Sequence, residues 1–277
     1  KYFKSTGETD TMIKDITIGQ YYPAKSILHR LDPRVKFVGT IAFLISLFVA
    51  NSLWGYLLAT AFLAVVIVLS KVPVKFMMKG LKPLFFIFIL TVAFNLFLVP
   101  GKVVVQIWIL KITEEGIRQA IKIGIRLIYL VMGSSVMTLT TTPNQLTDGL
   151  EKLMRPLNKI KVPVHEIAMM VSIALRFIPI LMEETDKIMK AQIARGADFE
   201  SGNLIKKAKN LIPLLVPLFI SAFRRADDLA MAMEARCYHG GDHRTSMKPL
   251  KYQNHDIMAY LVLLVYLIAD IVLRIIV

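Results

Sequence analysis

Long apolar runs, separated by short polar segments, are the main pattern along this chain. A helix needs roughly 20 apolar residues to cross a bilayer, and five runs approach that length. They are Val35–Ala50, Leu53–Leu69, Leu84–Val99, Ile123–Leu139 and Ile257–Val277. Only Asn51 and Ser52 separate the first two runs, which therefore predict a transmembrane hairpin. The pattern as a whole predicts an all-α polytopic membrane protein with about five transmembrane helices.

Polar residues inside these runs are few. Asn95 and Arg126 lie in the third and fourth runs, where they are the best candidates for lining a substrate path. Bonding between helices, or snorkelling of the arginine to the interface, is the more ordinary interpretation of both. Asp270 and Arg274 are four positions apart and share one helix face. The β-branched segment Val103–Leu110 is too short to span and indicates an interfacial strand or a re-entrant piece.

A long segment between the fourth and fifth runs predicts about three amphipathic helices on the cytoplasmic side. The resulting divisions are residues 1–140 (N-terminal segment and transmembrane helices 1 to 4), 141–255 (cytoplasmic helices) and 256–277 (C-terminal transmembrane helix). The first amphipathic helix begins at Thr142, with Pro143 at its first position and Gln145 completing a capping box.

The other two amphipathic helices are longer and contain prolines. The second covers about Val164–Arg195, and Pro179 predicts a kink within it. The third covers about Leu204–Arg236, and Pro213 and Pro217, one turn apart, predict a bend in its first half. Both helices are too apolar to be simple surface connectors, so they must pack on each other, on the membrane helices or on a partner.

Composition excludes several classes of protein. The 277 residues are 55% hydrophobic with a mean hydropathy of +0.57, and Lys+Arg exceed Asp+Glu by 34 − 20 = 14. A disordered chain lacks so many aliphatic residues, and a single cysteine, Cys237, rules out a disulfide scaffold. The apolar excess also fits poorly with a nucleic-acid-binding domain, despite the positive charge. A membrane protein with basic loops remains.

The basic residues predict the orientation, because Lys and Arg in short loops favour the cytoplasmic side. Residues 71–82, between the second and third runs, hold four lysines and no acidic residue, and the polar N-terminal segment is also basic. The Asn51–Ser52 turn has no basic residue. The N-terminus and the long amphipathic segment are therefore expected in the cytoplasm, and the C-terminus outside.

The second and third amphipathic helices end in the same short motif. The second ends with Ala194–Gly196 and the third with Ala235–Cys237, so that Arg195 and Arg236 are 41 positions apart. A single arginine at a helix C-terminus is explained by the helix dipole. Two copies at corresponding ends favour a docking role, because an arginine between small residues can make paired bonds to carboxylates or carbonyls of a partner. Two such ends predict a dimeric cytoplasmic partner.

Further short segments occur in a fixed order along nearly the whole chain. They are Ile18–Pro23, Ser26, Leu28–Lys36, Thr142-Pro143, Ala174–Pro179, Ala191–Ala197, Arg225-Ala226 and Ala232–Arg236. Each is weakly specific, but the ordered set resembles the transmembrane T component of energy-coupling factor (ECF) transporters, which are vitamin and micronutrient importers of the ABC class. One departure is Cys237, where that family commonly has Gly or another small residue.

The resemblance implies a chain that is not an enzyme and binds no cofactor, because two partner ABC-type ATPase subunits bind ATP-Mg. A separate membrane-embedded S component binds the substrate, and the complex lies in a bacterial or archaeal cell membrane. The residues implied to dock on the ATPases are Ala194, Arg195, Gly196, Ala235, Arg236 and Cys237. The residues implied to support the docking helices are Gln192, Arg176, Pro179 and Glu234.

Other chemistry finds little support in the sequence. The Gly101–Val103 stretch lacks the upstream glycine and the hydroxyl residue of a Walker A loop, and His165–Glu166 lacks the second histidine of a zincin motif. No metal or nucleic acid is therefore expected. The alternative function is a self-contained secondary transporter of a small molecule. It needs a polar path through the spans, for which Asn95, Arg126 and Asp270 are the available residues.

Overall fold

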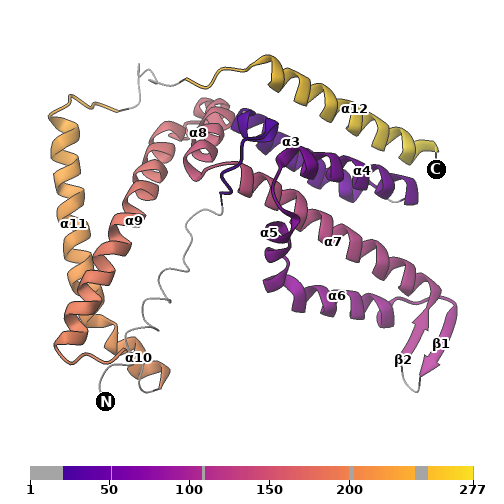
Figure 1. The fold of residues 1–277 in the computed structure, drawn as a ribbon, viewed down its shortest axis with the longest axis horizontal. Coiled ribbons are helices and arrows are strands. Elements are labelled where there is room, and N and C mark those ends of the chain that lie inside the picture. The colour runs from indigo at the N-terminus through magenta and orange to yellow at the C-terminus, as the bar shows by residue number, and fades with distance from the viewer. Residues whose placement is uncertain (1–20, 51, 108–109, 200–202, 241–248, 277) are drawn as a thin grey trace. The chain divides into compact units, whose positions relative to one another are not determined.

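The computed structural model describes residues 21–50, 52–107, 110–199, 203–240 and 249–276 (Figure 1). Motif residues 18–20 and the turn residue Asn51 lie outside these ranges. The chain divides into two compact units. The smaller is Leu150–Pro249, and the larger combines Ile18–Gly149 with Leu250–Val277.

The larger unit contains most of the predicted membrane helices. Its elements are α2 (Ile27–Arg30), α3 (Pro33–Val49), α4 (Leu53–Ser70), α5 (Val74–Lys79), a 3₁₀ turn (Lys82–Leu84), α6 (Phe85–Leu98), β1 (Val103–Ile107), β2 (Leu110–Thr113), α7 (Glu114–Thr140) and α12 (Asn254–Ile276). Helix α8 (Pro143–Met154) crosses the boundary between the units. The smaller unit continues with a 3₁₀ helix (Arg155–Ile160), α9 (Val164–Ala194), α10 (Leu204–Asn210) and α11 (Ile212–Glu234).

Within the described ranges, five helical segments are long and apolar enough to cross a membrane, and the predicted all-α polytopic class is confirmed. They are Leu53–Ser70, Val74–Leu98, Glu114–Thr140, Val164–Ala194 and Asn254–Ile276. Four of these overlap predicted runs. The first predicted run forms α3, which at 17 residues is slightly shorter than the five. The remaining segment, α9, was predicted as a cytoplasmic helix and not as a span.

Helix α9 is continuous over 31 residues, with Pro179 inside it. Its most apolar stretch has a mean hydropathy of 1.7, so length and composition alone permit it to cross a membrane. Its second half carries Glu183, Glu184, Asp186 and Lys187, which are costly in lipid. An apolar first half and a charged second half suit a helix that packs on apolar surfaces while it reaches into water.

Helix α7 starts nine residues before the predicted fourth run at Ile123. Thr113 caps it, because its Oγ1 accepts a hydrogen bond from the Gly116 amide at 3.0 Å. Glu114 and Glu115 lie in its first turn, where negative charge suits the helix dipole. Hydropathy identifies only the apolar part of a helix, so the predicted boundary missed this polar start.

The third predicted amphipathic helix is two helices, α10 and α11, which meet at Leu211. Pro213 explains the break, because it has no N–H to donate to the carbonyl of Lys209, four residues earlier. Proline is favoured in the first turn of a helix, so α11 begins there. The prediction of one bent helix was therefore wrong, whereas Pro217 lies inside α11 as expected.

Helices α3, α4, α7 and α12 share the core of the larger unit. Its buried residues are Phe43, Leu47, Ala59, Leu63, Leu263 and Tyr266. Gly133 of α7 allows a close approach, because a Cβ there would lie 2.8 Å from the ring of Phe43. The Ser46 hydroxyl and the Tyr266 hydroxyl lie 2.7 Å apart and join α3 to α12.

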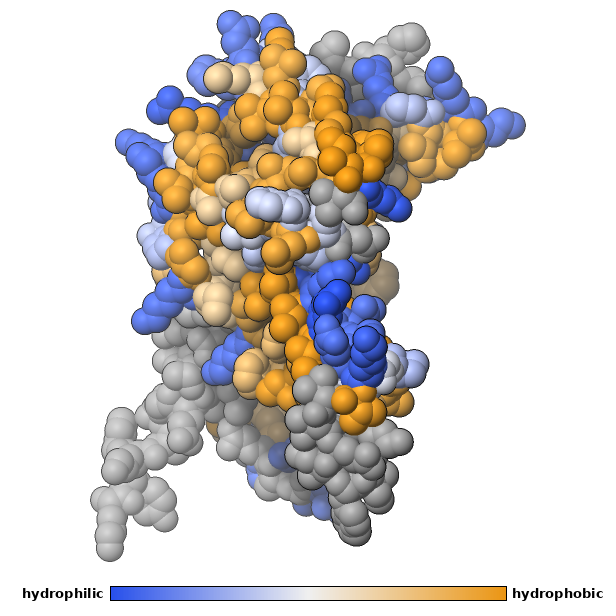
Figure 2. Space-filling view, turned by 90° about the vertical axis from the view of Figure 1, so that its right-hand side faces the viewer, coloured by the Kyte–Doolittle hydropathy of each residue, from blue (hydrophilic) through white to orange (hydrophobic). Residues whose placement is uncertain are grey.

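Many apolar side chains of the larger unit remain exposed. Figure 2 shows hydrophobic residues over much of the visible face, with hydrophilic residues along its edges and in one cluster right of its middle. In α6, Phe85, Phe86 and Leu98 are 62%, 74% and 69% exposed. Apolar surface of this extent is expected where lipid or another membrane protein covers it. The exposure therefore agrees with a multi-pass membrane protein.

Strands β1 and β2 pair antiparallel and form a hairpin between α6 and α7. The strand interpretation is therefore confirmed for Val103–Ile107 and for Leu110, whereas residues 108 and 109 lie outside the described ranges. The capping box of α8 is also confirmed. The Thr142 amide donates to Gln145 Oε1 at 3.1 Å, and the Gln145 amide donates to Thr142 Oγ1 at 3.3 Å.

Candidate functional site

The motif Ala194–Gly196 lies at the C-terminal end of α9 and is called the first tip here, and Ala235–Cys237 at the end of α11 is the second tip. Two backbone hydrogen bonds close α9 at the first tip. The Gly196 amide donates to the carbonyl of Ile193 at 2.9 Å, and the Ala197 amide donates to that of Gln192 at 2.9 Å. This pair of bonds is a Schellman motif, which needs a left-handed residue directly after the C-cap. Gly196 provides it with φ of +89°, and Arg195 occupies the C-cap. The expected stop at Gly196 is confirmed.

The second tip closes α11 in the same way. The Cys237 amide donates to the carbonyl of Glu234 at 2.8 Å, and the Tyr238 amide donates to that of Met233 at 3.0 Å. Cys237 is the left-handed residue, with φ of +56°. Each bond joins the residues 41 positions after those of the first tip, so the two closures correspond residue for residue.

Both tips are exposed. Ala194, Arg195 and Gly196 are exposed, as are their counterparts in the second tip. A Cβ placed on Gly196 would meet nothing within 4 Å. The sequence predicts that the small residue after each arginine keeps bulky side chains away from it. The structure adds a second requirement, a left-handed backbone conformation at that small residue. Cys237 meets the first requirement, but its conformation costs about 1 kcal/mol relative to an ordinary one.

Two of the four supporting residues lie at the tips. The Gln192 side-chain amide donates to the carbonyl of Pro213 at 3.3 Å and joins the last turn of α9 to the start of α11. This carbonyl has no helical donor, because Pro217, four residues later, lacks an N–H. Glu234 contributes its carbonyl to the second closure.

The other two supporting residues lie far from the tip. Arg176 and Pro179 are exposed in the middle of α9, 19 and 16 residues before Arg195. At 1.5 Å per residue they stand roughly 24–28 Å from the helix end. They therefore lie far from Arg195 at the first tip.

An ion pair that the sequence analysis did not identify joins α9 to α11. The two helices contact each other and run antiparallel (Figure 1). Arg225 Nη2 lies 2.9 Å from Glu184 Oε2. Arg225 belongs to a recognised motif, but nothing in its own neighbourhood in the sequence points to Glu184. The signal that could have found the pair is the 41-residue spacing, which separates these two residues as well as the two tip arginines.

The N-terminal motif Leu28–Lys36 forms a polar network that holds helix ends together. Asp32 caps α3 and accepts hydrogen bonds from the Arg34 amide at 2.9 Å and from its Nη2 at 2.7 Å. The Asp32 amide donates to Asp256 Oδ1 on α12 at 2.8 Å. Lys36 Nζ donates to the carbonyl at the end of α7, that of Thr140, at 2.9 Å. The motif is thereby accounted for by packing of the larger unit.

The pKa values of two residues in this network follow from their surroundings. Burial alone would raise the pKa of Asp32, but hydrogen bonds and the charge of Arg34 outweigh it and hold the pKa below its ordinary 3.8. Burial lowers the pKa of His29 below 6.5, and its hydrogen bond with the Tyr22 carbonyl only partly opposes this. At neutral pH Asp32 is charged and His29 is neutral.

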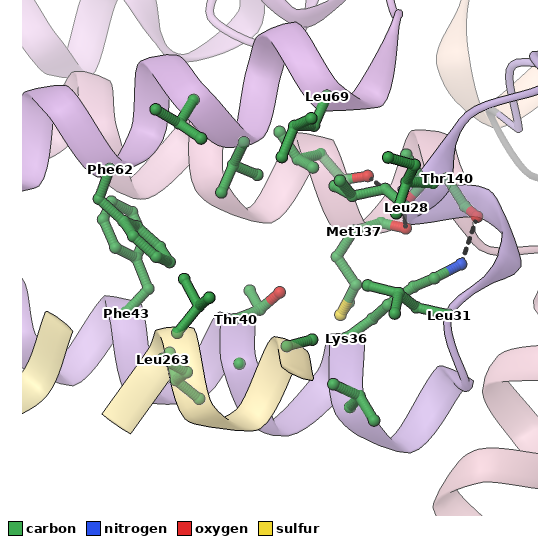
Figure 3. A pocket seen from close by; sticks show the side chains of 18 of the residues that line it. Leu28, Leu31, Lys36, Thr40, Phe43, Phe62, Leu69, Met137, Thr140 and Leu263 are labelled. Atoms are coloured by element: carbon green, nitrogen blue, oxygen red, sulfur yellow. Dashed lines mark hydrogen bonds between the residues drawn. The ribbon is translucent and has the colours of Figure 1, made fainter. Parts of the chain in front are cut away.

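A cavity of about 400 Å³ lies among α3, α4, α7 and α12 (Figure 3). Apolar side chains such as Phe43, Phe62 and Leu263 dominate its lining. At one end Lys36 reaches the carbonyl of Thr140 (Figure 3). A cavity with this lining suits an apolar group better than a hydrophilic solute.

The polar residues considered for a substrate path do not line this cavity. Arg126 Nη2 donates to the Tyr56 hydroxyl at 3.0 Å, which joins α7 to α4. Asn95 Nδ2 donates to the carbonyl of Thr91 in its own helix at 2.8 Å. Bonding between helices is therefore confirmed for Arg126, whereas Asn95 bonds within its own helix.

Comparison with known proteins identifies the family of this chain. Residues 24–247 match the CbiQ family, described as cobalt transport protein. The chain is 57% identical over 247 residues to the energy-coupling factor transporter transmembrane protein EcfT of Ruminiclostridium cellulolyticum, over 89% of this chain and 92% of that protein. It is 55% identical over 266 residues to EcfT of Clostridium kluyveri, over 95% and 98% of the two chains.

A third relative extends the comparison to a more distant genus. The chain is 48% identical over 246 residues to EcfT of Bacillus subtilis, over 88% of this chain and 93% of that protein. The CbiQ match, residues 24–247, includes the segments that hold both tips and ends before α12. The family expected from the ordered motifs is thereby confirmed, and the chain belongs to the EcfT family, the transmembrane proteins of energy-coupling factor transporters.

Proposed function

We propose that this chain is the energy-coupling scaffold of an ECF-type ABC importer. It passes the ATP-driven motion of two cytoplasmic ATPase subunits to a membrane-embedded S component that binds a vitamin or another micronutrient. The observation that carries the proposal is the pair of exposed arginines, Arg195 and Arg236, which two equivalent Schellman closures present. Membership of a family of transporter transmembrane proteins supports it.

The chemistry of the tips suits docking on a protein groove. A Schellman motif satisfies the carbonyls at the end of a helix, so the backbone there needs no further partner. The arginine guanidinium then offers a rigid fork of donors for carboxylates or carbonyls of the groove. Because the tips correspond residue for residue, each fits the same kind of groove, which two copies or two homologues of an ATPase provide.

The proposed division of labour leaves this chain without chemistry of its own. The ATPases bind and hydrolyse ATP-Mg, the S component selects the substrate, and this chain joins them in the cell membrane. Its N-terminus and both tips face the cytoplasm, and its C-terminus lies outside, as the basic loops indicate.

Charge reversal at both tips tests the docking. The double variant Arg195→Glu and Arg236→Glu is expected to insert into the membrane normally and to lose co-purification of the ATPases, because each groove would then meet a negative charge. Lys187→Glu with Arg224→Glu is the matched control, since it changes the same two helices and the same net charge at exposed positions away from the tips. Normal recovery of ATPases with the tip variant would refute docking through these arginines.

The single cysteine provides an independent test. Cys237 is exposed at the second tip, so a maleimide reagent is expected to label the isolated chain rapidly. Docked ATPases are expected to slow this labelling, and Arg236→Glu is expected to remove the protection. Equal labelling rates with and without bound ATPases would place the contact elsewhere on the chain.

A further inference from the structure

The two helices that carry the tips correspond along much of their length, not only at their ends. A shift of 41 positions places Arg195 on Arg236, and the same shift places Glu184 on Arg225. Glu184 precedes its tip arginine by 11 residues, and Arg225 precedes its own by the same 11. The ion pair between them, at 2.9 Å, therefore joins equivalent positions of the two helices.

This position has a geometric consequence for the tips. Helices α9 and α11 run antiparallel, so from the ion pair the two tips point in opposite directions along the pair (Figure 1). The part of each helix between the ion pair and the tip is called an arm. Eleven residues at 1.5 Å each make each arm about 16 Å long. Contact at equivalent positions gives arms of equal length, and the two tips are then related by an approximate two-fold axis through the ion pair.

A second contact agrees with this antiparallel arrangement. Gln192 lies eight residues after Glu184 on α9, and its partner Pro213 lies twelve residues before Arg225 on α11. Relative to the ion pair, this contact lies toward the C-terminus of α9 and toward the N-terminus of α11, as expected for an antiparallel pair. Together the two contacts fix both the crossing point and the register of the helices.

The ion pair is well placed to set register and poorly placed to contribute much to stability. The side chains of Arg225 and Glu184 are 37% and 28% exposed, so water weakens their attraction. Only Nη2 of the guanidinium bonds to the carboxylate, while the buried Nε has no hydrogen-bond partner among the described residues. The pair therefore needs one positive donor and one carboxylate at these positions, and not the full arginine fork.

We propose that Glu184 and Arg225 are a positioning pair that fixes where α9 and α11 cross, so that both tips stand at equal distances from the crossing point. This deepens the proposed function and rests on it, because equal arms matter for two ATPase grooves related by two-fold symmetry. A shift of one helix along the other would lengthen one arm, shorten the other and move both tips away from such a pair of grooves.

The distance between the tips tests the proposal in the full chain without ATPases. Spin labels on native Cys237 and on the Ala197→Cys variant report this distance by double electron–electron resonance. A narrow distribution is expected for otherwise unchanged protein, with helix ends on the order of 30 Å apart. Glu184→Arg alone and Arg225→Glu alone are each expected to broaden the distribution or to shift it by several ångströms, because like charges then face each other.

Two further variants separate positioning from general damage to the fold. The combined exchange of Glu184→Arg and Arg225→Glu, and the conservative Arg225→Lys, are expected to restore the narrow distribution. The matched control exchanges the adjacent exposed pair, Glu183→Arg with Arg224→Glu, whose positions are also 41 apart, and is expected to change nothing. Unchanged distances in the single variants, or no rescue by the combined exchange, would overturn the proposal.

Recovery of ATPases with the same variants separates this proposal from the one on which it rests. Loss of ATPases in the single variants and return in the combined exchange is the result expected when both proposals hold. The tip distance could instead respond as described while the ATPases are recovered normally even with Arg195→Glu and Arg236→Glu together. That result would refute docking through the tips and leave Glu184 and Arg225 as the pair that sets helix register.

Discussion

At the scale of single residues, the position after each tip arginine carries a backbone requirement that composition does not reveal. Gly196 adopts φ of +89° and Cys237 adopts φ of +56°. Glycine at such a position is predictable from sequence, because it is the usual residue after a helix end. Cysteine there is not predictable from propensity, and only the correspondence with the first tip indicates its conformation.

The backbone strain at Cys237 predicts opposite effects of two substitutions. Cys237→Gly is expected to stabilise the second closure by about 1 kcal/mol, less the entropy that glycine loses on folding. Gly196→Ala is expected to destabilise the first closure by about 1 kcal/mol, and a clash cannot explain the effect, because a Cβ there meets nothing within 4 Å.

Hydrogen–deuterium exchange of the amides at each tip measures both effects. About 1 kcal/mol corresponds to about fivefold faster exchange at the first tip of Gly196→Ala, and the smaller net gain in Cys237→Gly corresponds to less than about fivefold slower exchange at the second tip. Exchange that changes in the same direction in both variants would contradict a left-handed requirement at the two positions.

Asp32 predicts a pH dependence of stability. Its pKa is lower in the folded chain than its ordinary 3.8, so the folded state holds the charged form more strongly than the unfolded state does. The stabilisation is therefore complete at neutral pH and is lost as the pH falls below about 3.8 toward the folded-state pKa. Melting temperatures in detergent should show Asp32→Asn less stable than the unchanged protein at pH 7, with the difference shrinking below pH 4. A difference independent of pH would exclude the Asp32 charge as its source.

At the scale of helices, sequence patterns predicted where a helix begins and ends better than whether a long helix is interrupted in its middle. The Thr142–Gln145 capping box, the stop at Gly196 and the strand after Pro100 all occur as expected, because each depends on a few adjacent residues. The break at Leu211 was missed, although Pro213 supplies its cause. A proline permits either a bend or a new helix, and tertiary contacts such as that of Gln192 select between them.

The Gln192 contact predicts a dependence on Pro217. In the unchanged chain Gln192→Ala leaves the Pro213 carbonyl without its donor and should weaken the packing of α9 on α11 by about 1 kcal/mol. Pro217→Ala supplies an N–H at the position that normally bonds this carbonyl, so Gln192→Ala should then cost much less. A double-mutant cycle of melting temperatures measures the coupling, and equal costs in the two backgrounds would contradict it.

At the scale of the whole molecule, the predicted apolar runs and the helices long and apolar enough to span differ in one member. Four predicted runs lie in candidate spans, whereas α3 is slightly shorter and α9 was assigned to the cytoplasm. Hydropathy cannot distinguish a membrane span from a long helix that buries its apolar side against protein, because lipid and protein both keep water away from apolar side chains. The correspondence of α9 with α11 adds the missing information, because tips that match in structure are expected on the same side of the membrane.

The side of the membrane on which the tips lie is therefore the last prediction. If α9 remained in the cytoplasm, the first tip would be hidden from outside. If α9 crossed the bilayer, Arg195 would lie outside, where no ATP is available to a partner, whereas the antiparallel α11 would return Cys237 to the cytoplasmic side. The reporter is therefore Ala194→Cys in a Cys237→Ala background, at an exposed position of the first tip. In intact cells that produce this chain without partner ATPases, a membrane-impermeant maleimide is expected to leave this cysteine unlabelled. In inside-out vesicles the same reagent is expected to label it.

Two controls in a Cys237→Ala background calibrate the labelling. Lys102 lies between the third and fourth predicted runs, and a third span that starts from the basic inner loop at residues 71–82 places it outside. Lys102→Cys should therefore react in intact cells, whereas Lys75→Cys, in the basic inner loop, should react only in inside-out vesicles. Both side chains are exposed, so access depends on the membrane and not on burial. Labelling of Ala194→Cys in intact cells alongside correct behaviour of both controls would show that α9 spans the membrane, and docking of the first tip on a cytoplasmic ATPase would then be impossible.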